Sequence, residues 1–224
     1  MSDAMPPAIT FSDHSLDPAV RGWLHTPDVP NGDALILTHG AGSDCTAPLL
    51  VAIGETFAGH GYVVLRCDLP FRQDRRTGPP FPGNAERDRA GLGNAVAVLR
   101  KNVAGRIFLG GHSYGGRQST MLCAAEPDLV SGLLLLSYPL HPPRKPEQLR
   151  IHHLPGLRTP SLFVQGTRDP FGSVEEMTKA LQLVPAKTEL MKVEGAGHDL
   201  GFKGKAQAEE LPASVLARFE EMFS

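Results

Sequence analysis

Short runs of apolar and β-branched residues alternate along this chain with segments whose apolar residues recur at helical spacing. Several of the runs are apolar on both faces, as strands buried inside a parallel sheet are. The runs predict strands at residues 34–39, 62–68, 106–111, 132–138, 160–166 and 188–195, and the segments between them predict helices at 47–59, 84–103, 114–125, 173–183 and 205–222.

The strict alternation of strand and helix predicts an α/β fold, with right-handed crossovers and helices on both faces of a mostly parallel sheet. A further strand near residues 20–27 is expected to be antiparallel and close to an edge. Two proline-rich irregular segments, 68–84 and 139–160, follow the carboxyl ends of parallel strands, the side on which open α/β sheets bind ligands. The length of 224 residues, with no repeat or linker, favours a single domain in which 139–160 is a short cap-like insertion.

Composition limits the classes of partner. A hydrophobic fraction of 41% with 21% charged residues is typical of a globular protein, and a formal charge of −2 gives no general attraction to nucleic acid or to an anionic membrane. No leader or long apolar run is apparent, so a cytoplasmic location, as a monomer or a small homo-oligomer, is expected. The three cysteines are odd in number and lack CxxC spacing, which indicates reduced thiols; they are Cys45, Cys67 and Cys123.

The stretch "FLGGHSYGGRQS" puts Ser113 between paired glycines, after a predicted strand and before a predicted helix. A nucleophile on such a turn has a strained backbone, so the residues two before and two after it must be small, as Gly111 and Gly115 are. The helix that follows offers unpaired N–H groups to a developing oxyanion. The alternative is a glycine-rich structural turn, and the flanking strand and helix favour a nucleophile.

A serine nucleophile needs a base, and the base needs an acid that orients it. On this kind of turn the chain order is serine, acid, histidine. His198 in "VEGAGHDL" follows the last predicted strand, and Asp169 in "TRDPFG" follows the one before it. Ser113, Asp169 and His198 are therefore the predicted catalytic triad, with Glu194 as a second choice of acid.

The loop "THGAGSD" after an early strand is the predicted source of a second oxyanion donor. Ala41 N–H and Tyr114 N–H are the predicted pair, with Gly42 as the alternative to Ala41. His39 precedes the nucleophile and is expected to brace this loop by hydrogen bonding. No metal or organic cofactor is needed for chemistry of this kind.

Basic and aromatic side chains gather in the 68–84 segment and are candidates for holding an anionic group of a substrate. They are Phe71, Arg72, Arg75 and Arg76. The alternative is a solvated basic loop in which Asp74 is the local partner, and the sequence favours that alternative. Arg117 is expected to pair structurally rather than to bind substrate.

The motifs "HGAG", "GGHSYGG", "GTRD" and "GAGH", in this order, resemble those of the α/β-hydrolase superfamily, from about residue 20 to the end. In detail the chain is similar to short hydrolases distantly related to dienelactone hydrolases, and to the hydrolase-like domain of animal testis-expressed and nonspecific-lethal-complex proteins. The resemblance implies an α/β-hydrolase fold with a mostly parallel sheet of seven or eight strands and a minimal cap. Dienelactone hydrolases proper use a cysteine nucleophile, so their substrate does not transfer to a chain with Ser113.

The sequence thus predicts a serine hydrolase of the carboxylesterase type, which cleaves a small ester-like substrate through an acyl-enzyme. Two alternatives stay open. One is a non-catalytic interaction module on a hydrolase scaffold, which the presence of all three triad residues disfavours. The other is a serine peptidase, which usually carries a larger lid or gating domain than 224 residues allow.

Overall fold

The computed structural model describes residues 8–202 and 210–224. These residues form one eight-stranded sheet in the order β1-β2-β4-β3-β5-β6-β7-β8. The strands β1 and β2 and the strands β2 and β4 pair antiparallel, whereas all other neighbours are parallel. The strands are β1 Ile9–Asp13, β2 Val20–His25, β3 Ala34–Thr38, β4 Val63–Cys67, β5 Ile107–His112, β6 Gly132–Leu136, β7 Ser161–Gly166 and β8 Thr188–Val193.

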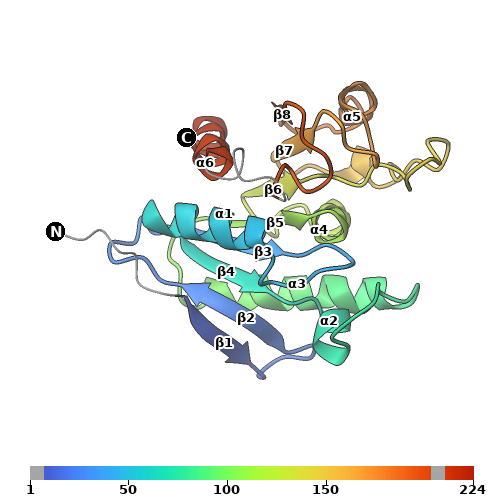
Figure 1. The fold of residues 1–224 in the computed structure, drawn as a ribbon. Helices are drawn as coiled ribbons and strands as arrows, with labels where there is room; N and C mark the ends of the chain where they lie inside the picture. The colour runs from blue at the N-terminus through green and yellow to red at the C-terminus, as the bar shows by residue number, and fades with distance from the viewer. Residues whose placement is uncertain (1–7, 203–209) are drawn as a thin grey trace.

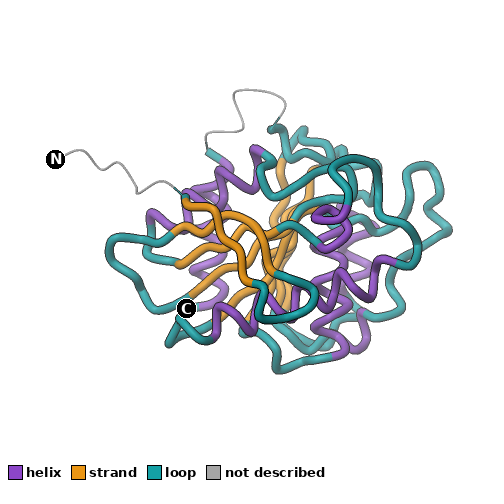
Figure 2. Tube along the Cα trace, turned by 90° about the horizontal axis from the view of Figure 1, so that it is seen from below, coloured by secondary structure: helices purple, strands orange, loops and turns teal. Residues whose placement is uncertain are grey.

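Helices cover both faces of the sheet, and the strands run through the middle of the molecule between them (Figures 1 and 2). Side chains of α1 and α6 pack on one face, and those of α3, α4 and α5 on the other. The helices are α1 Pro48–Gly59, α2 Pro70–Asp74, α3 Asn84–Arg100, α4 Tyr114–Ala125, α5 Val174–Leu181 and α6 Leu211–Phe223, and a 3₁₀ turn lies at Leu154–Gly156.

The central strands have no exposed face. In β3, Leu35 and Leu37 pack toward α1 and α6, whereas Ile36 packs toward α3. All three are 0% exposed, and a fully buried side chain of this size contributes about 1.5–3 kcal/mol to stability. The continuous apolar runs of the sequence therefore correspond to the strands that helices cover on both faces of the sheet.

The predicted fold class is confirmed, and each predicted strand is present within two residues of its expected bounds. The strand expected near 20–27 is β2, which is antiparallel and second from the edge because β1 lies outside it. The predicted helix at 205–222 is found from Leu211; its residues 205–209 lie outside the described part of the chain.

Two elements are missing from the sequence prediction. Strand β1 is short and half exposed, so it has no apolar run to mark it. Helix α2 lies within the 68–84 segment, which its prolines had marked as a loop, but Pro70 occupies the first helical position, where proline is tolerated. The buried Asp88 carboxylate accepts the Phe71 N–H at 3.0 Å and so ties α2 to α3.

Candidate active site

Ser113 lies between β5, which ends at His112, and α4, which begins at Tyr114. Its backbone has φ 51° and ψ −115°, a conformation that a residue with a side chain adopts only under strain. The Ser113 N–H donates to the Leu136 carbonyl of β6 at 2.9 Å, and its carbonyl accepts the Arg117 N–H at 3.0 Å. Neighbouring elements therefore hold the strained turn on both sides.

The turn passes so close to the end of β3 that only glycine fits beside Ser113. A Cβ on Gly111 would lie 2.3 Å from the Thr38 carbonyl oxygen. A Cβ on Gly115 would lie 2.5 Å from Thr38 Cγ2 and 2.6 Å from the His39 carbonyl oxygen. The sequence correctly assigns a steric role to this glycine pair, and the structure adds that the crowding comes from β3.

His198 lies in the loop after β8, and its imidazole bridges two side chains. Its Nδ1 is 2.8 Å from Asp169 Oδ2, and its Nε2 is 2.8 Å from Ser113 Oγ. A carboxylate can only accept, so we assign the ring proton to Nδ1, which leaves Nε2 as the acceptor for the Ser113 hydroxyl. The three side chains predicted from the sequence thus form one hydrogen-bonded chain.

Asp169 follows β7, and its carboxylate is fully buried. Phe171 N–H donates to Oδ1 at 2.8 Å, and Gln165 Nε2 donates to Oδ2 at 3.1 Å. These donors orient the carboxylate toward the His198 ring. The second acid candidate, Glu194, is exposed, whereas His198 Nδ1 bonds to Asp169.

Two rings flank the His198 imidazole. Phe171 stacks on it with 4.1 Å between centroids, and the His112 ring lies 5.0 Å away. His112 Nε2–H donates to the His198 carbonyl at 2.7 Å, which fixes the loop to the nucleophile turn. Burial lowers the pKa of His112 to about 4, so this histidine is neutral at pH 7.

The loop after β3 lies directly against Ser113. A Cβ on Gly40 would be 3.4 Å from the Ser113 Cβ. His39 is fully buried beneath this loop, where its Nε2 accepts the Leu69 N–H at 3.1 Å and its Nδ1–H donates to the Gly40 carbonyl at 2.9 Å. Burial lowers the pKa of His39, which keeps the ring neutral, so His39 braces the loop as expected.

A cleft of about 860 Å³ opens over Ser113 at the carboxyl edge of the sheet. We call it the Ser113 cleft. Its lining includes Gly40–Ser43, His112–Tyr114, Arg117, Pro139, Arg150, Pro170, Phe171, His198 and Asp199. Ala41 and Tyr114 therefore lie beside the nucleophile, and Tyr114 is the first residue of α4, whose N–H has no acceptor within the helix.

The candidate substrate residues of the 68–84 segment, which the sequence weighed against a solvated loop, are not brought into this cleft: Phe71, Arg72, Arg75 and Arg76 are absent from its lining. Arg72 is buried, and its guanidinium donates to the backbone carbonyls of Ser43 at 2.8 Å and of Ala41 at 3.0 Å, and to those of Arg75 and Gly78. It holds the loop beside Ser113 instead of facing a ligand.

The other three residues are also occupied elsewhere or exposed. Phe71 is buried with its ring against that of Tyr114, at a centroid distance of 5.8 Å. Arg75 packs over the Phe81 ring at 4.1 Å, and Arg76 is exposed. Asp74, the expected partner of the arginines, pairs instead with Arg87 at 2.8 Å.

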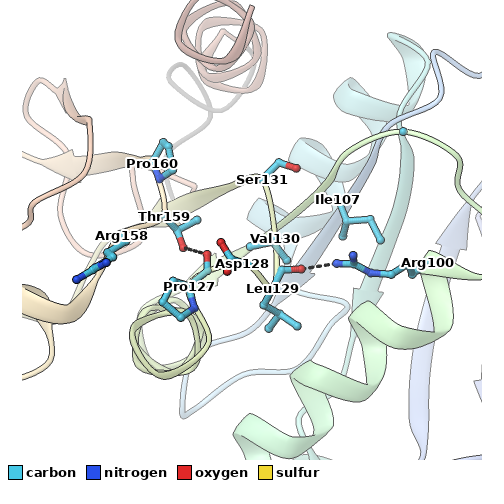
Figure 3. A pocket seen from close by; sticks show the side chains of 11 residues that line it. Arg100, Ile107, Pro127, Asp128, Leu129, Val130, Ser131, Arg158, Thr159 and Pro160 are labelled. Carbon is cyan, nitrogen blue, oxygen red and sulfur yellow. Dashed lines mark hydrogen bonds between the residues drawn. The ribbon is translucent and has the colours of Figure 1, made fainter.

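A second cavity, of about 360 Å³, lies at the opposite edge of the sheet, beside the amino ends of β5, β6 and β7 (Figure 3). Two of its polar side chains bond to backbone carbonyls: Arg100 donates to that of Leu129, and Thr159 Oγ1 donates to that of Pro127 at 3.2 Å. Since the hydrogen-bonded Ser113, His198 and Asp169 all lie at the carboxyl edge, chemistry is expected there and not in this second cavity.

Several residues around the site were not predicted as such. Phe171 and Gln165 flank Asp169 within six residues of it, so their closeness in sequence was a usable signal. The place of Arg150 in the cleft could not be predicted, because the irregular 139–160 segment has no periodicity from which the position of a side chain can be inferred. Arg117 was expected to make a structural pair, but within the described ranges no ion pair joins it to a carboxylate.

Cys45, Cys67 and Cys123 are all free and buried. Burial raises the pKa of each thiol, to about 12 for Cys67 and Cys123, so none is a reactive thiolate at neutral pH. In the described part of the chain, no three His, Cys, Asp or Glu side chains are grouped so as to hold a metal ion. No helix among residues 8–202 and 210–224 has the length and apolarity needed to cross a bilayer.

Comparison with known proteins assigns the family. The profile described as "Alpha/beta hydrolase domain" matches residues 31–221, so the chain belongs to the α/β-hydrolase family. A curated relative, cutinase est2 of Thermobifida alba, is 26% identical over 149 residues, which make up 65% of this chain and 46% of the cutinase. The match therefore spans less than half the length of that relative.

Solved structures share the fold. Dienelactone hydrolase from Anabaena variabilis superposes with a TM-score of 0.78 at 19% identity, over 99% of this chain and 100% of that chain. A protein from Xanthomonas campestris, described as an α/β serine hydrolase without a lid, superposes with a TM-score of 0.74 at 14% identity, over 98% of both chains. At these identities the likeness concerns the fold alone.

Proposed function

We propose that this protein is a serine hydrolase that cleaves a carboxylic ester, or a similar small acyl substrate, through an acyl-enzyme. The observation that carries the proposal is the hydrogen-bonded chain from Ser113 Oγ through His198 to Asp169, with 2.8 Å at each step, on a nucleophile with φ 51°. Neither the strain nor the buried carboxylate is needed for a structural turn.

In the proposed mechanism, His198 Nε2 removes the Ser113 proton as Oγ attacks the substrate carbonyl. Asp169 fixes the Nδ1–H tautomer and stabilises the imidazolium that forms. The Ala41 and Tyr114 N–H groups stabilise the oxyanion, and the His39 hydrogen bond to the Gly40 carbonyl supports this by orienting the Gly40–Ala41 peptide, which carries the Ala41 N–H. His198 then protonates the leaving group, and water, activated by the same ring, releases the acyl group.

A small substrate is favoured by the size of the cleft. Its volume of about 860 Å³ lies within the range of small-molecule sites, and the 139–160 segment contains one 3₁₀ turn rather than a helical lid. The Xanthomonas campestris neighbour, described as lacking a lid, supports an open cleft of this kind.

The test is turnover of 4-nitrophenyl acetate and butyrate by the wild type and by Ser113→Ala. We expect turnover by the wild type and a loss of at least about 10³-fold in kcat for the variant, with unchanged thermal unfolding. Equal activity in the two proteins would remove Ser113 from the mechanism. A parallel panel of peptide amides separates an esterase from a peptidase, and an inert wild type would favour an interaction module.

A further inference from the structure

Two arginines line the Ser113 cleft without a carboxylate partner. They are Arg117 of α4 and Arg150 of the 139–160 segment. In the part of the chain that the structure describes, no ion pair joins either guanidinium to an acid. Arg117 Nε is buried and has no hydrogen-bond partner. The Arg117 side chain itself is half-buried. A buried N–H without an acceptor is costly unless a ligand supplies one.

The two guanidinium groups lie close enough to influence each other. Burial lowers the pKa of Arg150, and the positive charge of Arg117 is the next largest cause. The backbone around Arg150 is held in place, because its N–H donates to the Leu140 carbonyl at 2.8 Å and its carbonyl accepts the Tyr138 hydroxyl at 3.1 Å. Two guanidinium groups repel each other, so a backbone that holds them close together favours binding of an anion between them.

His153 and Arg89, which lie near Arg117, add no negative charge. Burial together with the Arg117 charge lowers the pKa of His153 to about 4, so this ring is neutral at pH 7. Arg89, another neighbour, donates to the Gln118 amide oxygen at 3.0 Å. Asp169, near the cleft, is hydrogen-bonded to His198. Asp199 lines the Ser113 cleft and also an adjoining cavity, which neither arginine lines.

The position of Arg117 relates this charge to the reaction. The Arg117 N–H donates to the Ser113 carbonyl, so the two residues lie one helical turn apart, about 6 Å along the axis of α4, and both line the cleft. An acyl chain of a few carbons, with its carbonyl at Ser113, spans such a distance.

We propose that Arg117 and Arg150 form an anion subsite of the Ser113 cleft, so that the preferred substrate is an ester whose acyl part carries a carboxylate. This inference rests on the proposed acyl-enzyme function and adds the substrate class. The sequence offered an anion clamp in the 68–84 segment as a candidate and favoured a solvated loop there, whereas the arginines that line the cleft come from α4 and the 139–160 segment.

The test compares two substrates that differ only in charge: mono-4-nitrophenyl glutarate and its methyl-capped form, 4-nitrophenyl methyl glutarate. We expect the wild type to prefer the anionic ester by at least about ten-fold in kcat/KM, mainly through a lower KM, because the arginines bind the ground state and the transition state alike. Arg117→Gln, Arg150→Gln and the double variant should bring the ratio toward one. Arg158→Gln, which removes an exposed arginine from the opposite edge of the sheet, is the matched control and should keep the wild-type ratio.

A second measurement needs no variant. Raising sodium chloride from 20 mM to 500 mM should reduce the charge preference of the wild type itself, because salt screens the arginines. If the wild type hydrolyses the capped ester but shows no preference for charge, or if both arginine variants keep the preference, the subsite is wrong and the proposed function stands. If the wild type hydrolyses neither glutarate ester but turns over 4-nitrophenyl acetate, the subsite alone fails. If it hydrolyses none of these esters, the proposed function fails, and the subsite fails with it.

Discussion

The Phe171 ring stacks on the His198 imidazole, with 27° between the ring planes, while the Phe171 N–H donates to the carboxylate that His198 contacts. One residue thus orients both the acid and the base. Phe171→Ala keeps the backbone hydrogen bond but frees the imidazole to rotate. We expect kcat for 4-nitrophenyl acetate to fall about ten-fold, with partial recovery in Phe171→Leu.

Phe81→Ala is the matched control for this prediction, because Phe81 is 63% exposed and lies outside the cleft lining. Steady-state kinetics together with thermal unfolding separate loss of positioning from loss of fold. Wild-type kcat in Phe171→Ala would contradict a positioning role for the ring.

The choice of acid is tested by Asp169→Asn and Glu194→Gln. An amide at position 169 cannot hold the Nδ1–H tautomer of His198 as a carboxylate does. We therefore expect Asp169→Asn to lose at least about 10²-fold in kcat with a small change in KM, and Glu194→Gln to retain activity. The reverse result would transfer the role to Glu194, the second candidate from the sequence.

Arg72 is expected to be structural. Its side chain hydrogen-bonds to four backbone carbonyls, on both the loop beside Ser113 and the segment after α2. Arg72→Ala should lower the free energy of unfolding by about 2–4 kcal/mol and reduce turnover by loosening the loop beside Ser113. Arg72→Lys should recover little, because an ammonium cannot reproduce the planar set of donors.

Urea unfolding measures the stability part of this prediction, and the exposed Arg76→Ala, which should stay within about 0.5 kcal/mol of the wild type, is the control. If Arg72→Ala were as stable as Arg76→Ala but selectively lost anionic substrates, Arg72 would belong to substrate binding, the less favoured of the two sequence hypotheses.

Acid should destabilise the fold through His112. Burial holds its pKa at about 4, below the ordinary value of 6.5, so the unfolded chain binds the additional proton between these two pH values. The stability contributed by neutral His112 is therefore complete above about pH 6.5 and is lost as the pH falls toward 4. For this group the loss amounts to about 2–3 kcal/mol.

Urea denaturation at pH 7.5 and at pH 4.5 tests this sign. His112→Asn should show a smaller loss of stability on acidification than the wild type, whereas the exposed His152→Asn should show the same loss as the wild type. An equal pH dependence in all three proteins would mean that His112 does not contribute.

Most of the sheet could be predicted from the sequence because buried parallel strands have continuous apolar sequences. Strand β1 and helix α2 lack such a sequence and are stabilised by contacts with neighbouring elements. The residues of the hydrogen-bonded chain were found because a strained turn, an acid and a base must follow strand ends in a fixed order. The one-domain organisation and the cytoplasmic location stay predictions.

The identity of the cleft arginines was not predictable in the same way. Charge clusters along the sequence show where cations are concentrated but not how many of their donors backbone carbonyls already take. Arg72 donates to four such carbonyls, whereas the Arg150 guanidinium donates to one, that of Pro139. Arg150 reaches the cleft through an irregular segment without periodicity, and Arg117 looked like an ordinary helix residue. Their shared cleft is a property of the tertiary structure.

The most direct test of the central claim is the mass of the protein after treatment with a fluorophosphonate, followed by peptide mapping. We predict one phosphonyl adduct on the wild type, located on Ser113, no adduct on Ser113→Ala, and labelling of His198→Ala at least about 10²-fold slower. An adduct on another residue, or an unlabelled wild type, would contradict the assignment of Ser113 as the nucleophile.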